Sequence, residues 1–442
     1  MITEFEKRFE KLGFDKLSPI QTAVYEPIKN GESVLGLAPT GSGKTLGFVV
    51  PMLERLAPGM GIQAMIIAPS QELAMQLTNV TRSFAQLVDL KVTALTGGAN
   101  IKNQLDQLKK HPEIVVGTPG RIQNLADDHK LKMSDLQTVI IDEADDLLDG
   151  ETLDTVRYIM QSAPSEVQLG FFSATETPIL QELEKWFGQP VTRYDVRDID
   201  TTQGEVRHGL LSVSNFKKAG MLSKLATVKQ FKGLVFFSHM GSLQQAKSWL
   251  IHHHAPVATL TANQRQTDRQ KALTDFRLGR VKLLLSTDVA ARGLDIAKLP
   301  AVVNYELPRS ANAYTHRTGR TGRMGEPGQV INLGDDHDFR DLKRMLKDTD
   351  YQLVPIYYNA HRLTTEPCVS ESSAVQSETS ASSKTTTSTS TEQATQSQAS
   401  ATEKTAHSAA SAKPRQNPVA TPKRHKKNKH SKRKGMRHKR QD

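Results

Sequence analysis

Three short motifs in this 442-residue chain combine residue types that handle phosphate groups. The first is Ala38-Pro39-Thr40-Gly41-Ser42-Gly43-Lys44-Thr45, which lies between the apolar run SVLGL and the helix-like run LGFVV. Glycines let backbone N–H groups approach phosphate oxygens, and the following helix presents the positive end of its dipole. In such a loop, Lys44 is expected to reach the β and γ phosphates and Thr45 to hold Mg²⁺. The strict pattern begins with glycine rather than Ala38, so a second motif is needed to support nucleotide binding.

The second motif is acidic and ends an apolar run, in the order Val139-Ile140-Ile141-Asp142-Glu143-Ala144-Asp145. Asp142 is placed to hold magnesium through water, and Glu143 is placed to orient or deprotonate the attacking water. The alternative is a solvated acidic strand end. The phosphate-binding loop in the same half of the chain favours the catalytic interpretation.

The third motif places three arginines at regular spacing, in His316-Arg317-Thr318-Gly319-Arg320-Thr321-Gly322-Arg323. This half of the chain has no phosphate-binding loop of its own. Arginines that reach a γ-phosphate from a second domain would stabilise charge in the transition state, as arginine fingers do. Composition alone favours a general nucleic-acid-binding patch, so the motif by itself does not decide between that patch and arginine fingers.

Short apolar runs that alternate with helical patterns must position these motifs. The runs predict an α/β fold with parallel sheets covered by helices on both faces. They are SVLGLA, QAMIIA, EIVVG, TVIID and LGFFSA in the first half, and GLVFFS, VATL, VKLLLS, AVVNYE and QVINLG in the second. The polar segment 196–206 is the expected linker, so we predict domains at 1–197 and 206–365 that enclose a cleft.

The charge of the chain is concentrated in a tail at 366–442. This tail holds 15 Lys and Arg against 6 Asp and Glu, so it carries a net charge of +9 out of the +11 of the whole chain. Serine and threonine make up 22 of the 43 residues from Ser370 to Ala412, a composition that predicts a disordered linker. The basic block at 423–440 is expected to anchor nucleic acid, with a solubilising role as the alternative.

Other features bound the class of protein. The apolar runs are too short for a membrane span, and the charged N-terminus is unlike a signal peptide. A single cysteine, Cys368, cannot form an intramolecular disulfide or a cysteine-based zinc site, which fits a cytoplasmic protein. His252-His253-His254 is interpreted as a surface helix end, and Trp186 and Trp249 as packing residues.

With TPGR at 118–121, SAT at 173–175 and STDVAARGLDI at 286–296, these motifs resemble those of the DEAD-box ATP-dependent RNA helicases. The resemblance extends over about residues 5 to 360. It implies two tandem RecA-like domains and an enzyme that couples ATP and Mg²⁺ use to local unwinding or remodelling of RNA duplexes.

Roles follow from the matching positions. The resemblance implies that Gln21 reads adenine, that Asp295 contacts the ribose and that Arg320 and Arg323 are the arginine fingers. Nucleotide state would be coupled to domain closure by Asp145, Ser173, Thr175 and His316. RNA contacts would come mostly through the sugar–phosphate backbone, from Gly97, Gly98, Thr118, Pro119, Gly120, Arg121, Gln266, Arg269, Thr287 and Asp288.

Three positions depart from the family pattern. Few residues precede Gly13, so the usual upstream aromatic that packs on adenine is missing unless Phe5 or Phe9 replaces it. The usual Pro-Thr-Arg-Glu-Leu-Ala reads Pro-Ser-Gln-Glu-Leu-Ala at 69–74, so Gln71 stands where an arginine would supply a strong donor. Ser18-Pro19 is a milder change.

An RNA helicase is the first hypothesis. An ATP-gated RNA clamp or annealing protein is the second, and a DNA translocase is the third. Ribosomal particles in assembly and RNA-processing complexes in turnover are both candidate settings, between which the sequence does not choose.

Overall fold

The computed structural model describes residues 1–367 apart from 262–263, 292–295, 297–298 and 324. The predicted disordered linker and basic tail, 366–442, lie outside the described residues except for their first two positions. No helix among the described residues is long and apolar enough to cross a membrane.

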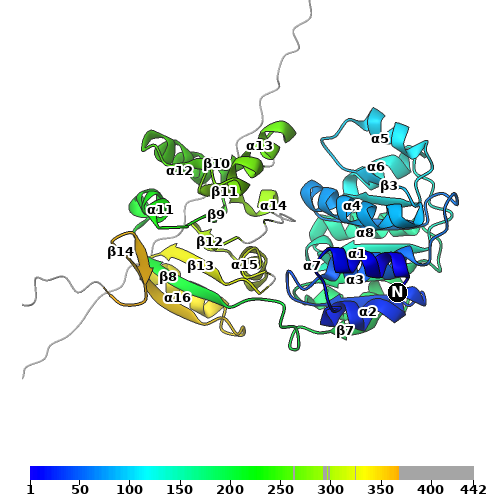
Figure 1. The fold of residues 1–442 in the computed structure, drawn as a ribbon, viewed down its shortest axis with the longest axis horizontal. Helices are drawn as coiled ribbons and strands as arrows, with labels where there is room; N and C mark the ends of the chain where they lie inside the picture. Colours follow the sequence, from blue (N-terminus) through cyan, green and yellow to red (C-terminus); the bar gives the residue numbers. More distant parts are fainter. Residues whose placement is uncertain (262–263, 292–295, 297–298, 324, 368–442) are drawn as a thin grey trace, which may run out of the picture. The chain divides into compact units, whose positions relative to one another are not determined.

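A parallel sheet forms the centre of the N-terminal half (Figure 1), with strand order β3-β4-β2-β5-β6-β1-β7. Its central strands are buried along their whole length, as expected of strands covered on both faces. The strands are β1 (Val34–Leu37), β2 (Ala64–Ile67), β3 (Val92–Leu95), β4 (Ile114–Gly117), β5 (Thr138–Asp142), β6 (Gln168–Ser173) and β7 (Thr192–Asp195).

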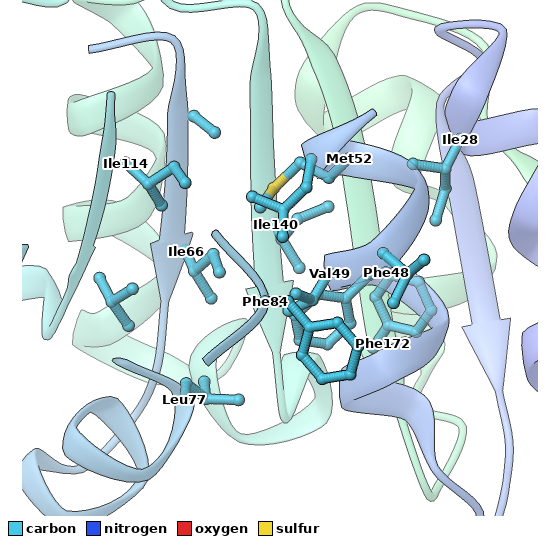
Figure 2. Close-up of a cluster of buried hydrophobic side chains, with 14 of the residues drawn as sticks. Ile28, Phe48, Val49, Met52, Ile66, Leu77, Phe84, Ile114, Ile140 and Phe172 are labelled. Atoms are coloured by element: carbon cyan, nitrogen blue, oxygen red, sulfur yellow. The ribbon is translucent and has the colours of Figure 1, made fainter. Parts of the chain in front are cut away.

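Helices cover both faces of this sheet. The buried apolar side chains therefore form two clusters, one on each face of the sheet. Figure 2 shows one cluster, in which α3 side chains such as Phe48 and Met52 lie among strand side chains such as Ile140 and Phe172. The helices are α1 (Thr3–Lys11), α2 (Pro19–Lys29), α3 (Lys44–Leu53), α4 (Gln71–Ala85), α5 (Ile101–Leu108), α6 (Pro119–Asp127), α7 (Ala144–Leu147), α8 (Gly150–Gln161), α9 (Pro178–Gln181) and α10 (Leu183–Phe187).

The C-terminal half contains a second sheet, with strand order β10-β11-β9-β12-β13-β8-β14-β15. Its strands pair in parallel, except that β15 is antiparallel to β14. The strands are β8 (Val206–Ser212), β9 (Gly233–Phe237), β10 (Val257–Leu260), β11 (Leu283–Thr287), β12 (Ala301–Asn304), β13 (Gly328–Gly334), β14 (Leu353–Asn359) and β15 (Arg362–Thr364). The helices are α11 (Lys218–Thr227), α12 (Met240–His252), α13 (Gln266–Arg277), α14 (Asp288–Ala291), α15 (Ala311–Thr318) and α16 (Asp336–Met345).

The predicted α/β fold with parallel sheets is therefore confirmed. Each apolar run that the sequence analysis named coincides with a strand, whereas β3, β7, β8, β14 and β15 were not predicted. The phosphate loop follows β1, the acidic residues of the second motif begin at the last residue of β5, and Thr287 ends β11, so these residues lie at the carboxyl ends of strands, where α/β sheets bind ligands. The arginine motif at 316–323 instead begins in the last turn of α15 and continues toward β13.

Candidate nucleotide and RNA site

The glycine-rich loop connects β1 to α3, as the sequence predicted. Gly41 and Gly43 both have φ of 87°, a left-handed conformation that glycine adopts at little cost. Because α3 begins at Lys44, the N–H groups of its first turn are open at the loop. The loop and the start of α3 together form an anion-binding geometry.

Lys44 folds back onto this loop. Its Nζ donates hydrogen bonds to the carbonyl oxygens of Ala38 at 2.6 Å and Pro39 at 2.8 Å. Burial lowers the pKa of Lys44 to about 8, even though the nearby carboxylates Asp142 and Asp145 act in the opposite direction. A phosphate group that approached the loop would favour the charged ammonium.

Gln21 links the start of α2 to the same loop. Its Oε1 accepts a hydrogen bond from the Ser18 backbone N–H at 3.0 Å, and its Nε2 donates to the Gly43 carbonyl oxygen at 3.1 Å. The side chain therefore braces the loop in this structure, and its predicted contact with adenine stays a prediction.

Phe5 and Phe9 belong to the core rather than to a base-stacking position. Both rings lie 5.8 Å from the ring of Phe84, in edge-to-face geometry, and both are buried. In this arrangement neither ring presents a face on which a base could stack.

The acidic motif lies at the end of β5. Burial, reinforced by the charge of Glu143, raises the pKa of Asp142 to about 7. Glu143 has φ of 53° and donates its backbone N–H to Oδ1 of Asp142 at 3.1 Å. A left-handed backbone at a non-glycine residue is uncommon and often marks a functional site.

Asp145 connects the acidic motif to two of the other coupling residues. Its Oδ2 accepts hydrogen bonds from Oγ1 of Thr175 and, at 2.7 Å, from Nε2 of His316. Ser173 holds the turn that carries Thr175, because its Oγ donates to the Thr175 carbonyl oxygen at 2.6 Å. The structure thus brings together all four residues predicted to couple nucleotide state to closure.

The arginine motif lies against the phosphate loop and the acidic motif. Nη2 of Arg320 is 3.3 Å from Oε1 of Glu143. The carbonyl oxygen of Gly319 accepts from Oγ1 of Thr40 at 3.1 Å and from Nε of Arg323 at 2.8 Å. Groups that lie far apart in the sequence therefore meet around one position, where a phosphate chain would find Lys44, a carboxylate and guanidinium groups.

The predicted RNA contacts of the first half follow two neighbouring strands. Gly97 and Gly98 come after β3, and Thr118 precedes α6, which begins at Pro119 and Gly120. The side chain of Gln71 lies beside both glycines, since a methyl group on either would come within 3.3 Å of its amide.

Arg121, on the same helix, is held by a buried partner. Its Nη1 donates to Oε1 of Gln104 at 2.9 Å, and Nε2 of Gln104 donates to the Thr96 carbonyl oxygen at 2.9 Å.

In the second half, Arg269 is engaged with protein groups. Its Nη2 is 2.5 Å from Oε1 of Glu72, and its Nη1 donates to the Thr261 carbonyl oxygen at 2.6 Å. Thr287 ends β11 and Asp288 begins α14. The side chain of Gln266 and the whole of Asp295 lie outside the described residues, so the structure says nothing of their predicted contacts.

Arg317, the first of the three evenly spaced arginines, is buried in a polar cluster of the C-terminal half and is not one of the two arginines that the family resemblance implies as fingers. Its Nε and Nη2 lie 2.5 and 2.7 Å from the two carboxylate oxygens of Asp288. Its Nη1 donates to Oδ1 of Asn304 at 3.0 Å and to the Glu306 carbonyl oxygen at 2.7 Å. The even spacing of the arginines concealed that this one points into its own domain.

Two family profiles match the chain. The profile described as DEAD/DEAH box helicase matches residues 18–183, and the profile described as Helicase conserved C-terminal domain matches residues 217–325.

Individual proteins are similar over most of the folded region. The "Probable ATP-dependent RNA helicase YfmL" of Bacillus subtilis is 36% identical over 82% of this chain and 96% of its own length. The "DEAD-box ATP-dependent RNA helicase CshC" of Bacillus cereus is 33% identical over 77% of this chain and 88% of its own. Among solved structures, S. cerevisiae Dbp5 bound to RNA and ADP BeF3 is 26% identical, with a TM-score of 0.71 over 80% of this chain and 94% of that chain.

Proposed function

Because this chain belongs to the DEAD-box family of ATP-dependent RNA helicases, we propose how its residues use ATP to separate RNA strands. ATP binds the loop at 38–45 of a RecA-like domain at 1–197, and a second domain at 206–365 supplies the arginine fingers. The observation that carries this proposal is the 3.3 Å approach of Arg320 to Glu143.

Magnesium is the proposed cofactor of ATP, held by Thr45 and by Asp142 through water. The residues fit a cation, because Asp142 is a buried carboxylate whose pKa is raised to about 7 by burial and by Glu143. A divalent ion favours the ionised form of such a group. When bound, Mg²⁺ would neutralise charge on the β and γ phosphates.

Each step of hydrolysis has a candidate residue. Lys44 leaves its loop carbonyls to bind the β and γ phosphates, and Gln21 selects adenine. Glu143 orients or deprotonates the attacking water. Arg320 and Arg323 stabilise the charge that develops on the transferred phosphoryl group, since guanidinium groups can donate two hydrogen bonds to phosphate oxygens.

RNA binding is proposed to follow the sugar–phosphate backbone along the segments that contain Gly97, Thr118, Arg121, Arg269 and Thr287. Contacts of this kind are independent of sequence and sensitive to salt. Asp145 and His316 transmit the closed state to the catalytic residues. ATP then drives unwinding because it binds the closed form more tightly than the open form.

The cellular setting is proposed on chemistry alone. A sequence-independent helicase with a basic block at 423–440 suits large, structured RNA, such as RNA in ribosome assembly or RNA in turnover. The block would raise the local concentration of RNA near the domains without reading its sequence. The single cysteine fits a cytoplasmic location.

ATP hydrolysis by the full-length protein tests these roles. We expect phosphate release to be stimulated by single-stranded RNA more than by DNA of matched sequence, and the stimulated rate to be lost in Lys44→Ala. Lys130→Ala, a change at an exposed lysine of the same domain, is the matched control. Equal rates in Lys44→Ala and the wild type would overturn the assignment of the loop.

The position of Gln71 beside Gly97 and Gly98 supports a second candidate function, an ATP-gated RNA clamp that anneals strands. A neutral amide holds phosphate less strongly than a guanidinium, so strand separation would be weaker. In Glu143→Gln, a clamp would keep ATP-dependent RNA binding and annealing. Loss of annealing in that variant would count against the clamp.

A further inference from the structure

One segment of the C-terminal half contains no acidic residue at all. From Val206 to Thr267 there is neither Asp nor Glu, although the chain averages about one carboxylate every nine residues. The same segment carries 8 Lys and Arg and 5 His. Such an asymmetry of sign points to an anionic partner rather than to a general solubilising surface.

Two helices of this segment lie together on one side of the sheet. Leu222 and Leu225 of α11 belong to the same apolar cluster as Leu243 and Leu250 of α12. The helices touch where a methyl group on Gly220 would come within 3.6 Å of the Trp249 ring. Their outward side chains therefore form a continuous surface.

Aromatic rings stand on this surface. Phe216 lies in the 3-10 turn Asn215–Lys217 that leads into α11, and it is fully exposed. Trp249 is 37% exposed, and its ring stacks on that of His253 with centroids 3.6 Å apart and planes 14° apart. The fully exposed Phe216 offers a π-face that a nucleic-acid base can cover, and the stacked Trp249–His253 pair adds partly exposed ring surface.

Two exposed lysines and one exposed glutamine lie near these rings along the two helices. Lys217 is the next residue after Phe216. Lys224 follows Gly220 by four residues, so it lies on the same side of α11 as Gly220. Gln245 precedes Trp249 by four residues on α12, and it is exposed. Proteins that bind single-stranded nucleic acid combine aromatic rings, on which bases stack, with cations that contact phosphates.

Three carboxylates from other described elements lie near Lys218 of this segment, namely Asp335, Asp338 and Glu306. Oδ1 of Asp335 accepts the backbone N–H groups of His337 at 2.9 Å and Asp338 at 3.0 Å. Asp338 lies 3.9 Å from the buried Lys218. Oε2 of Glu306 accepts backbone N–H groups of Ser238 at 2.6 Å and His239 at 3.1 Å. None of these contacts involves Lys217 or Lys224, and Nζ of Lys224 lies 5.9 Å from the centroid of the Tyr358 ring on β14.

We propose that this surface, the α11–α12 face, is a second RNA-binding site. It is formed by Phe216, Lys217, Lys224, Gln245, Trp249 and His253, and it takes single-stranded RNA by base stacking and phosphate contacts. Binding there needs no nucleotide, because no residue of the phosphate loop takes part. The basic block at 423–440 carries charge of the same sign and is therefore not the occupant.

Trp249 provides a local probe for the test. The chain has two tryptophans, so Trp186→Phe in the full-length protein leaves Trp249 as the single indole. Adding an oligouridylate of about 20 nucleotides without ATP should quench its fluorescence through base stacking, and salt should reverse the effect. Absence of quenching at low salt would overturn the proposal, as would equal quenching by poly-glutamate, which would indicate an acidic protein partner.

Variants then separate this site from the catalytic residues. In the same background, the double variant Phe216→Ala, Lys224→Glu should bind the oligouridylate about tenfold more weakly in the quenching titration, since one stacking and one phosphate contact are lost. Phe216 is fully exposed, so its loss removes no core packing. Lys343→Glu on α16 is the control and should leave the affinity for the oligouridylate unchanged. Equal effects of the two charge reversals would contradict the site, whereas failure of ATP hydrolysis alone would not.

Discussion

Nε2 of His316 lies 2.7 Å from Oδ2 of Asp145, and this contact joins the arginine motif on α15 to the acidic motif on α7. Burial alone would lower the pKa of His316, but the hydrogen bond to Asp145 holds the pKa above its ordinary value. Burial would likewise raise the pKa of Asp145, and the contact with His316 holds it below its ordinary value. Both partners therefore favour an ionised pair.

Loss of this pair should uncouple RNA binding from ATP turnover. In His316→Asn we expect RNA-stimulated turnover to fall by about tenfold or more, because a buried charged hydrogen bond is lost. RNA-free turnover should change little, since Lys44 and Glu143 are untouched. The measurement is kcat at saturating ATP with and without RNA. His337→Asn, at an exposed histidine 3.3 Å from Asp341, is the control, and an equal fall in both rates would refute the coupling role.

Arg320 should act on the rate of hydrolysis rather than on ATP affinity. Its guanidinium lies 3.3 Å from Glu143, where charge would develop on a transferred phosphoryl group. We expect Arg320→Ala to lower kcat by about 1,000-fold, a loss typical of arginine fingers. Its Kd for ATP should stay within about threefold of the wild-type value. Stopped-flow binding and single-turnover hydrolysis separate the two quantities. Arg344→Ala, on the exposed side of α16, should behave as the wild type, and a large rise in Kd for Arg320→Ala would argue for a binding role.

The central strands could be predicted from the sequence because burial on both faces demands unbroken apolar runs. β7 escaped prediction for the opposite reason. Its residues, Thr192–Asp195, are largely exposed at the edge of the sheet and, among the described strands, pair with β1 alone. An edge strand carries little apolar pattern, so its position is decided by tertiary pairing.

The candidate site was predictable where a motif fixes backbone geometry, as the glycines of the phosphate loop do. It was not predictable where a side chain chooses between partners. Gln21 bonds to Gly43, Arg269 pairs with Glu72, and Arg317 turns toward Asp288. These choices depend on which elements pack together, and the spacing of residues along the chain does not encode them.

Gln71 offers a gain-of-function test. Its amide lies beside Gly97 and Gly98, so an arginine there could donate to a phosphate of RNA bound at these glycines. We expect Gln71→Arg to tighten RNA binding in the presence of an ATP analogue by about three- to tenfold and to steepen the salt dependence by about 0.7 in log–log slope. Fluorescence anisotropy at several salt concentrations measures both. Gln86→Arg, at the far end of α4, is the matched control, and the same gain in both variants would mean that net charge alone is responsible.

Stability of the C-terminal half should depend on His208. Burial lowers the pKa of His208 to about 4 from 6.5, while its Nδ1 lies 2.8 Å from the Tyr314 hydroxyl. The unfolded chain therefore binds a proton more readily than the folded chain between these values, so stability falls as the pH drops below 6.5.

In His208→Gln this contribution should vanish. The wild type should lose about 2 kcal/mol more unfolding free energy than the variant between pH 7 and pH 5. Urea unfolding followed by Trp249 fluorescence in the Trp186→Phe background reports on the half of the chain that contains His208. His337→Gln, at an exposed position, should keep the full pH dependence of the wild type. Parallel pH profiles for His208→Gln and the wild type would mean that His208 is not the group whose protonation destabilises this half.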